Sequence, residues 1–118
     1  SGWKIPSEND WNSLVIFLGG ENLAGGKMKS KNGWFDGGDG TNESGFDGLP
    51  SGYRSDYYEG GIGAFYSGGE IGGWWCATIV EMNDYGDAQY LQLYYSSKEA
   101  GLTLCYKANG YSVRCIKD

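Results

Sequence analysis

The chain of 118 residues contains no histidine. Histidine is the commonest general base in enzymes and the commonest zinc ligand, so its absence removes the Ser-His-Asp, Cys-His and HExxH classes of active site. Paired carboxylates for glycoside hydrolysis stay open as a minor alternative, because fifteen acidic residues are present and only geometry identifies such a pair. The sequence predicts no catalytic residue, no metal ligand and no cofactor.

Basic residues and long apolar runs are also scarce. Nine Lys and Arg stand against fifteen Asp and Glu, which gives a formal charge of −6, and no basic stripe is present to neutralise phosphates. No apolar run reaches the roughly 18 residues needed to cross a bilayer, and the chain does not open on a signal peptide. We expect a soluble domain with no nucleic-acid partner and no transmembrane segment.

Aliphatic residues and proline are sparse, whereas glycine and aromatic residues are abundant. The chain has 22 Gly, ten Tyr and five Trp but only two Pro. A core with so few aliphatic side chains depends on aromatic rings, and the glycines suit loops and turns with positive φ. This composition favours a loop-rich extracytoplasmic domain, either secreted or displayed on a cell surface.

Cysteine is rare and its count is odd, with residues at 76, 105 and 115. One of the three therefore lacks an intrachain partner. Two interpretations stay open at this point, one disulfide bridge or three buried and reduced thiols that act as small hydrophobes.

A helix is predicted from Glu8 to Leu18. Ser7 is a good N-cap, Asp10 follows it three positions later, and apolar residues then recur with i, i+3, i+4, i+7 spacing. A Gly-Gly pair ends this helix, because glycine adopts the left-handed conformation that closes helices. A second short helical turn is predicted from Ala24 to Lys29.

The segment from Lys31 to Gly73 is predicted to form ordered loops, because it is too long for an ordinary connection and too aromatic for a disordered linker. Large apolar side chains are expected to pin these loops to the core: Trp34, Phe35, Phe46, Leu49, Tyr53, Phe65 and Tyr66.

Strands follow the loops. The last two are predicted to form a hairpin around Ala108-Asn109-Gly110, and in Tyr90 to Tyr94 the leucines alternate with polar and phenolic side chains. The result is an α+β domain with an N-terminal helix, long ordered loops and a C-terminal antiparallel sheet. The predicted strands are Trp74 to Glu81, Ala88 to Tyr95, Leu102 to Lys107 and Tyr111 to Ile116.

Six segments, in this order, resemble the Fibrobacter succinogenes major paralogous domain. The resemblance spans nearly the whole chain and implies the C-type lectin-like fold that is shared with the formylglycine-generating enzymes. It also implies a secreted protein or surface lipoprotein of bacteria. The segments are Gly2-Trp3-Lys4-Ile5-Pro6-Ser7-Glu8-Asn9-Asp10-Trp11, Leu18-Gly19-Gly20, Gly40-Thr41-Asn42-Glu43-Ser44-Gly45-Phe46, Leu49-Pro50-Ser51-Gly52-Tyr53-Arg54, Trp74-Trp75-Cys76-Ala77-Thr78 and Tyr111-Ser112-Val113-Arg114-Cys115.

The resemblance carries two further expectations. The family's usual opening includes a Cys-Pro before the Gly-Trp, so residues 1–118 form a single domain that lacks its first strands, and the absent cysteine is a candidate partner for Cys115. The related enzymes that oxidise cysteine use a closely spaced cysteine pair. Cys105 and Cys115 are ten residues apart on two predicted strands, which does not fit that chemistry.

The segment from Met82 to Ser97 is rich in Tyr, Asn, Asp, Gln and Ser, a mixture typical of antibody contact loops. In C-type lectin-like folds this part of the sheet commonly forms the recognition surface. The alternative is that the tyrosines only cover a sheet poor in aliphatic residues, and Trp74 and Trp75 are interpreted as core. The predicted ligand-binding residues are Asn83, Tyr85, Tyr90, Gln92, Tyr94 and Asn109.

Two other features are given structural interpretations. The segment from Asp36 to Glu43 is rich in oxygen ligands but lacks the acid spacing of an EF-hand, so a solvated acidic loop is favoured over a calcium site. Arg54 and Arg114 are expected to tie loop carbonyls or an acid together with their guanidinium groups.

Three functions compete at this stage. The first is a non-catalytic module that binds an unknown protein or carbohydrate ligand through a face rich in Tyr and Asn. The second is a carbohydrate-active enzyme or its substrate-binding accessory domain, and the third is a structural spacer in a larger surface protein. The fold alone separates none of them.

Overall fold

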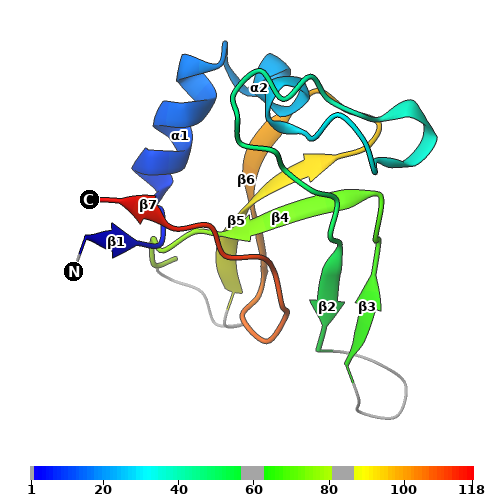
Figure 1. The fold of residues 1–118 in the computed structure, drawn as a ribbon. Helices are drawn as coiled ribbons and strands as arrows, with labels where there is room; N and C mark the ends of the chain where they lie inside the picture. Colours follow the sequence, from blue (N-terminus) through cyan, green and yellow to red (C-terminus); the bar gives the residue numbers. More distant parts are fainter. Residues whose placement is uncertain (1, 57–62, 81–86) are drawn as a thin grey trace.

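The computed structural model describes residues 2–56, 63–80 and 87–118, and it confirms the predicted α+β class. Its strands form three antiparallel sheets, ordered β1-β7, β2-β3 and β4-β5-β6 (Figure 1). Within the described residues, no helix is both long enough and apolar enough to span a membrane. The elements are β1 (Trp3–Lys4), α1 (Glu8–Phe17), α2 (Glu21–Met28), the 3-10 helix η1 (Phe35–Gly37), β2 (Tyr53–Ser55), β3 (Ala64–Tyr66), β4 (Ile71–Trp75), β5 (Asp87–Tyr94), β6 (Ala100–Tyr106) and β7 (Ile116–Lys117).

The first helix begins where the sequence predicts. The Ser7 hydroxyl accepts a hydrogen bond from the Asp10 backbone N–H at 3.2 Å, and the Asp10 carboxylate accepts one from the Ser7 backbone N–H at 2.9 Å. This reciprocal pair satisfies two donors at the helix start. After Leu18 the chain leaves the helix through Gly19 and Gly20, at φ values of 106° and 98°. The second predicted helix is also confirmed, and it begins three residues earlier than expected.

Aromatic rings dominate the interior, as the composition predicts. Trp11 of α1 packs edge-on against Phe46 at 5.9 Å between ring centroids, and Phe46 packs in the same way against Trp74 of β4 at 5.0 Å. Trp34 is buried as well. Four of the predicted core pins are wrong, because their side chains are exposed: Phe35, Leu49, Phe65 and Tyr66. Phe65 is 81% exposed, since the β2-β3 hairpin projects from the body (Figure 1).

The β4-β5-β6 sheet has the predicted alternation. Leu91 and Leu93 of β5 are fully buried and face the core, where Leu91 pairs with Leu102 of β6. Because side chains alternate along a strand, Tyr90, Gln92 and Tyr94 lie on the opposite side of the sheet.

The predicted hairpin between β6 and a strand from Tyr111 to Ile116 is wrong. The chain does turn after β6, but Gly110 then exchanges two backbone hydrogen bonds with Arg54, at 2.7 and 2.9 Å. Ser112 forms a parallel bridge with Trp74, so this segment lies along β4, at the opposite edge of the sheet from β6. Only Ile116–Lys117 is a strand, and it pairs with β1. The path of this segment is therefore determined by its backbone contacts with Arg54 and Trp74, which are distant in sequence, and not by the local turn composition.

The strand predicted from Trp74 to Glu81 is displaced toward the N-terminus, because β4 runs from Ile71 to Trp75. Beyond it, the Ala77 N–H donates to the carbonyl of Pro6 at 2.8 Å, and the Thr78 hydroxyl accepts a hydrogen bond from the Glu8 N–H. These contacts direct the chain toward the start of α1 instead of along β5.

Candidate functional site

The candidate site lies on the side of the β4-β5-β6 sheet that carries Tyr90, Gln92 and Tyr94, which we call the outer face. The strand register places Gly73 of β4 and Gly101 of β6 on either side of Gln92, and it places Thr103 opposite Tyr90. Gly73 is covered, since a Cβ there would overlap the ring of Tyr111. Gly101 is open, since a Cβ there would meet no atom within 4 Å.

The open glycine leaves a hollow of about 250 Å³, which we call the trough. A strand glycine presents no side chain, so the neighbouring side chains form walls around an empty position. Most of the residues that line the trough have polar side chains: Gln92, Tyr94, Ser97, Glu99, Gly101 and Thr103.

A second hollow of about 490 Å³, the tyrosine cavity, lies beyond the trough at the other end of β5 and β6, where residues from both sides of the sheet line it. Its framework is a stack of rings. Tyr111 stacks on Tyr90 at 4.1 Å between centroids and on Tyr53 at 5.5 Å, and Tyr53 contacts Tyr66 across the β2-β3 hairpin. Other residues complete the lining: Asp87, Leu104, Cys105, Tyr106 and Asn109.

The two hollows are neighbours on the same strands. Tyr90 lines the tyrosine cavity and Gln92 lines the trough, and the Tyr90 hydroxyl donates a hydrogen bond to the Gln92 side-chain oxygen at 2.6 Å. On β6, Thr103 lies opposite Tyr90 and lines the trough, while Cys105, two positions further on and opposite Ala88, lines the tyrosine cavity. The two hollows therefore follow one another along β5 and β6.

Three ionisable groups of the tyrosine cavity, Tyr90, Cys105 and Tyr111, have raised pKa values that favour their neutral forms. Burial, together with hydrogen bonding to Tyr90, raises the pKa of Tyr111, and burial raises the pKa of Tyr90 itself. Burial and the nearby Asp87 carboxylate raise the pKa of the Cys105 thiol to about 11. At neutral pH these residues therefore offer hydroxyl and thiol groups instead of a phenolate or thiolate nucleophile.

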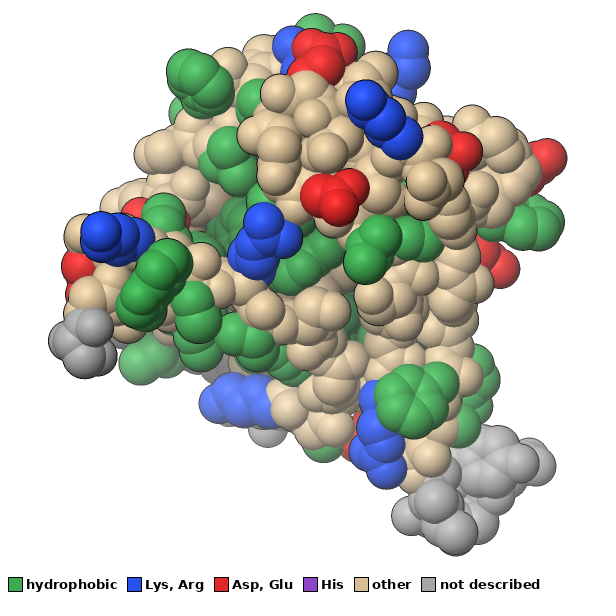
Figure 2. All heavy atoms as spheres, viewed as in Figure 1, with side chains coloured by type: hydrophobic (Ala, Val, Ile, Leu, Met, Phe, Trp, Pro, Cys, Tyr) green, Lys and Arg blue, Asp and Glu red, His purple; other side chains and the backbone are tan. Residues whose placement is uncertain are grey.

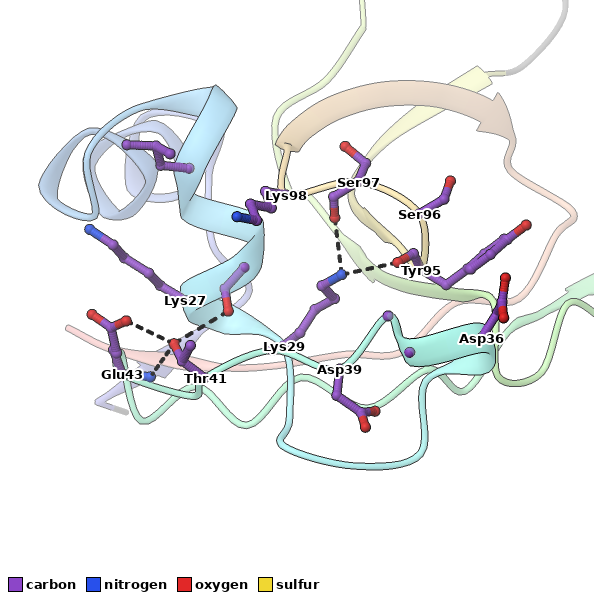
Figure 3. Close-up of a pocket in the computed structure, with 15 residues that line it drawn as sticks. Lys27, Lys29, Asp36, Asp39, Thr41, Glu43, Tyr95, Ser96, Ser97 and Lys98 are labelled. Carbon is purple, nitrogen blue, oxygen red and sulfur yellow. Dashed lines mark hydrogen bonds between the residues drawn. The ribbon is translucent and has the colours of Figure 1, made fainter.

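The turn between β5 and β6 is fixed by a buried cation. Lys29, 3% exposed, donates from its ammonium group to the carbonyls of Tyr94, Tyr95 and Ser97 at 3.2, 3.4 and 3.0 Å. Figure 3 shows this ammonium pointing from the end of α2 into the turn. Its position 5.1 Å from the centre of the Trp34 ring adds a cation–π contact. Because Ser97 also lines the trough, Lys29 supports the end of the trough from behind.

The acidic loop from Asp36 to Glu43 borders a separate hollow of about 460 Å³ around Lys29 (Figure 3). Two of its three acids are engaged locally: Asp39 accepts from the Trp34 N–H at 2.9 Å, and Glu43 accepts from the Thr41 hydroxyl at 3.0 Å. No group of three or more His, Cys, Asp or Glu residues suited to a metal ion occurs in the described ranges.

The structure divides the six predicted ligand-binding residues into three pairs. Tyr90 and Asn109 line the tyrosine cavity, where Tyr90 is only 7% exposed, and Gln92 and Tyr94 line the trough. Asn83 and Tyr85 fall outside the described residues.

Several residues of both hollows were not predicted as site residues. Tyr53 and Tyr111 were not among them because their stacking joins β2 to the C-terminal segment. Thr103 could have been found, since it alternates with the leucines on either side of it in the predicted strand from Leu102 to Lys107. No local signal marks Gly101, because its role depends on the strand register.

One arginine has the predicted structural role. Arg114 donates to the carbonyl of Phe46 at 2.9 Å and lies 4.7 Å from the centre of its ring, which ties the C-terminal segment to a core loop. Arg54 is exposed. The three cysteines are not bonded to one another, and only Cys76 is buried, whereas Cys105 is partly exposed and Cys115 is exposed. The structure therefore supports neither the single bridge nor three buried thiols.

Charged side chains are scattered among uncharged and hydrophobic ones on the side of the molecule seen in Figure 2.

No curated protein and no solved structure matches the chain. The family model of the Fibrobacter succinogenes major domain matches residues 1–117, nearly the whole sequence. This chain therefore belongs to the Fibrobacter succinogenes major domain family of bacterial proteins.

Proposed function

We propose that this domain is a non-catalytic binding module, secreted or displayed on the cell surface, and that its ligand binds on the outer face. The observation that carries the proposal is the hollow beside Gly101, where the sheet is left open and polar. The amide nitrogen of Gln92 and the hydroxyl of Thr103 have no hydrogen-bond partner among the described residues. Such groups are available to a ligand without rearrangement of the protein.

The same groups favour binding over catalysis. The carboxylates that line the two hollows, Asp87 and Glu99, belong to different hollows and are not brought together as a catalytic pair would be. The thiol of Cys105 is a poor nucleophile at neutral pH because its pKa is raised. What remains is a set of hydrogen-bonding groups and rings on a rigid sheet.

The proposal includes the wider C-type lectin-like superfamily and an extracytoplasmic location. Its support is the family resemblance, together with the arrangement of helices first, long ordered loops in the middle and an antiparallel sheet last. The high content of glycine and tyrosine agrees with a domain that presents ordered loops to a partner.

A screen with two matched variants tests the function. The wild-type domain is labelled and applied to arrays of bacterial surface proteins and of glycans, with and without chelator. Gly101→Leu fills the trough, whereas Gly68→Leu adds the same side chain at another position where a Cβ meets no atom within 4 Å. We expect binding that survives Gly68→Leu and chelation but is lost in Gly101→Leu. Binding that is unaffected by Gly101→Leu would reject the outer face, and a screen without any ligand would favour the structural spacer.

A further inference from the structure

We infer that the ligand of the outer face is an uncharged carbohydrate chain that lies across the trough and the tyrosine cavity. This inference rests on the proposed binding function and adds the chemical class of the ligand. It follows from three properties of the outer face, namely its charge, its hydrogen-bonding groups and its shape.

The charge of the outer face excludes anionic ligands. Among the described residues, no Lys or Arg side chain lines either hollow, while Asp87 lines one and Glu99 lines the other. The chain as a whole carries a formal charge of −6. A phosphate, a sulfated glycan or an acidic peptide would meet carboxylates with no compensating cation, which is an unfavourable arrangement.

The hydrogen-bonding groups match hydroxyls. A sugar hydroxyl both donates and accepts, so it pairs with carboxamides, carboxylates and other hydroxyls. Gln92 accepts from Tyr90 and keeps its amide nitrogen as a donor, and Asn109 accepts from the Asp56 N–H at 3.1 Å and keeps its own. Asp87 and Glu99 supply acceptors, which form the stronger charge-assisted hydrogen bonds with hydroxyl donors.

Rings stand beside these polar groups. Tyr106 is 56% exposed at the tyrosine cavity, and Tyr94 is half-buried at the trough. A sugar ring has apolar C–H faces as well as hydroxyl edges, and aromatic side chains present broad apolar faces for such contacts. Each hollow therefore combines an aromatic ring with a carboxamide. This combination suits a ligand in which every unit has both an apolar face and polar edges, as a sugar does.

The shape favours a chain over a single small molecule or a protein. Gly101 and Cys105 are four positions apart on β6, so the outer face extends roughly 13 Å along this strand. A globular protein partner requires about 1,000 Å² of total buried surface with an apolar centre, whereas these two hollows are small and most of the residues around them carry polar atoms in their side chains. An extended oligosaccharide fits the elongated surface by lying along it.

The test uses neutral oligosaccharides as probes. Hexamers of glucose, xylose, mannose and N-acetylglucosamine units, and a sulfated glycan for comparison, are titrated into the wild-type domain in EDTA by calorimetry. The variants are Gly101→Leu with Gly68→Leu as its control, and Thr103→Val with Thr103→Ser as its control. Circular dichroism and thermal unfolding verify that each variant is folded.

We expect at least one neutral hexamer to bind and the sulfated glycan not to bind. Gly101→Leu should weaken binding at least tenfold and Gly68→Leu should not change it. Thr103→Val should weaken binding roughly threefold to tenfold, the effect of one hydrogen bond, and Thr103→Ser should restore it.

Three results would overturn the inference: no binding of any neutral hexamer, preference for the sulfated glycan, or neutral binding that Gly101→Leu does not alter. A protein ligand lost in Gly101→Leu, with no hexamer bound, would retain the proposed binding function and reject only the carbohydrate.

Discussion

Lys29 carries its charge inside the protein without a carboxylate partner among the described residues. Three backbone carbonyls and the Trp34 ring take the place of that partner. Burial lowers the pKa of the ammonium group, because desolvation disfavours the charged form. The geometry of the turn after β5 therefore depends on one side chain.

We expect Lys29→Met to destabilise the domain by about 2–4 kcal/mol, because it removes a donor that three part-buried carbonyls share, and among the described residues only the carbonyl of Tyr94 keeps another, the Ser97 N–H. Urea denaturation followed by tryptophan fluorescence measures the change in the free energy of unfolding. Lys27→Met is the matched control, since Lys27 lies in the last turn of α2, two residues before Lys29, and its ammonium makes no hydrogen bond to a described residue. Equal effects of the two substitutions would contradict this role for Lys29.

The thiol of Cys105 makes stability depend on pH in the alkaline range. Its pKa is raised from 9.0 to about 11 by burial and by Asp87. Between these two values the unfolded chain loses the proton and the folded domain keeps it, so the free energy of unfolding falls as the pH rises. Because the side chain is partly exposed, we expect this loss to stay below about 2 kcal/mol.

Cys105→Ser removes this titration. Urea denaturation of wild type and variant at pH 8, 9, 10 and 11, under reducing conditions, should show a smaller decline for the serine variant. A residual decline is expected in both proteins, since the raised pKa of Tyr111 acts in the same direction. Parallel profiles for the two proteins would show that the thiol has no such effect.

The side of the sheet on which a site residue lies can be predicted from the sequence when that residue belongs to a strand with a clear alternation. Tyr90, Gln92 and Tyr94 alternate with leucines, so their common side of the sheet follows from the sequence. Their exposure does not follow from it. Tyr90 is covered because Tyr111 stacks on it, and Tyr111 reaches that place through hydrogen bonds of its neighbours to strands far away in sequence.

The first helix shows how local signals define an element. Its capping pair, Ser7 and Asp10, is contiguous with the helix that it starts. Ser7→Ala should cost about 1 kcal/mol of stability, as N-cap removal commonly does. Ser13→Ala, an exposed position in the same helix, should be neutral or slightly stabilising, because alanine has the higher helix propensity. Chemical denaturation of both variants measures the difference, and similar values would show that the cap contributes little.

The strands show where local signals fail. Asn109-Gly110 has the composition of a hairpin turn, and the chain does turn there. The following segment nevertheless pairs with Arg54 and Trp74, because those backbone groups lie open at the other edge of the molecule. Turn composition predicts a reversal of direction, but it does not determine which strand receives the returning chain.

At the scale of the whole molecule, the composition predicts that aromatic rings fill the interior, but it does not predict the shape of the outer face. A chain with five tryptophans and few aliphatic residues has to build its core from rings, and Trp11, Trp34 and Trp74 do so. The outer face was predictable only in part, because the trough depends on a missing side chain in β6 lying beside Gln92 of β5. Such a relation exists only once the strand register is formed.

The pairing of β1 with β7 has a mechanical consequence. Trp3 lies opposite Lys117 and Lys4 opposite Ile116, so the two ends of the chain leave the molecule side by side (Figure 1). A force that pulls residue 2 away from residue 118 would open this ladder like a zipper, one pair after another, instead of shearing all pairs together. Under tension these two short strands would yield first, while the outer face, built on longer strands, would keep its shape.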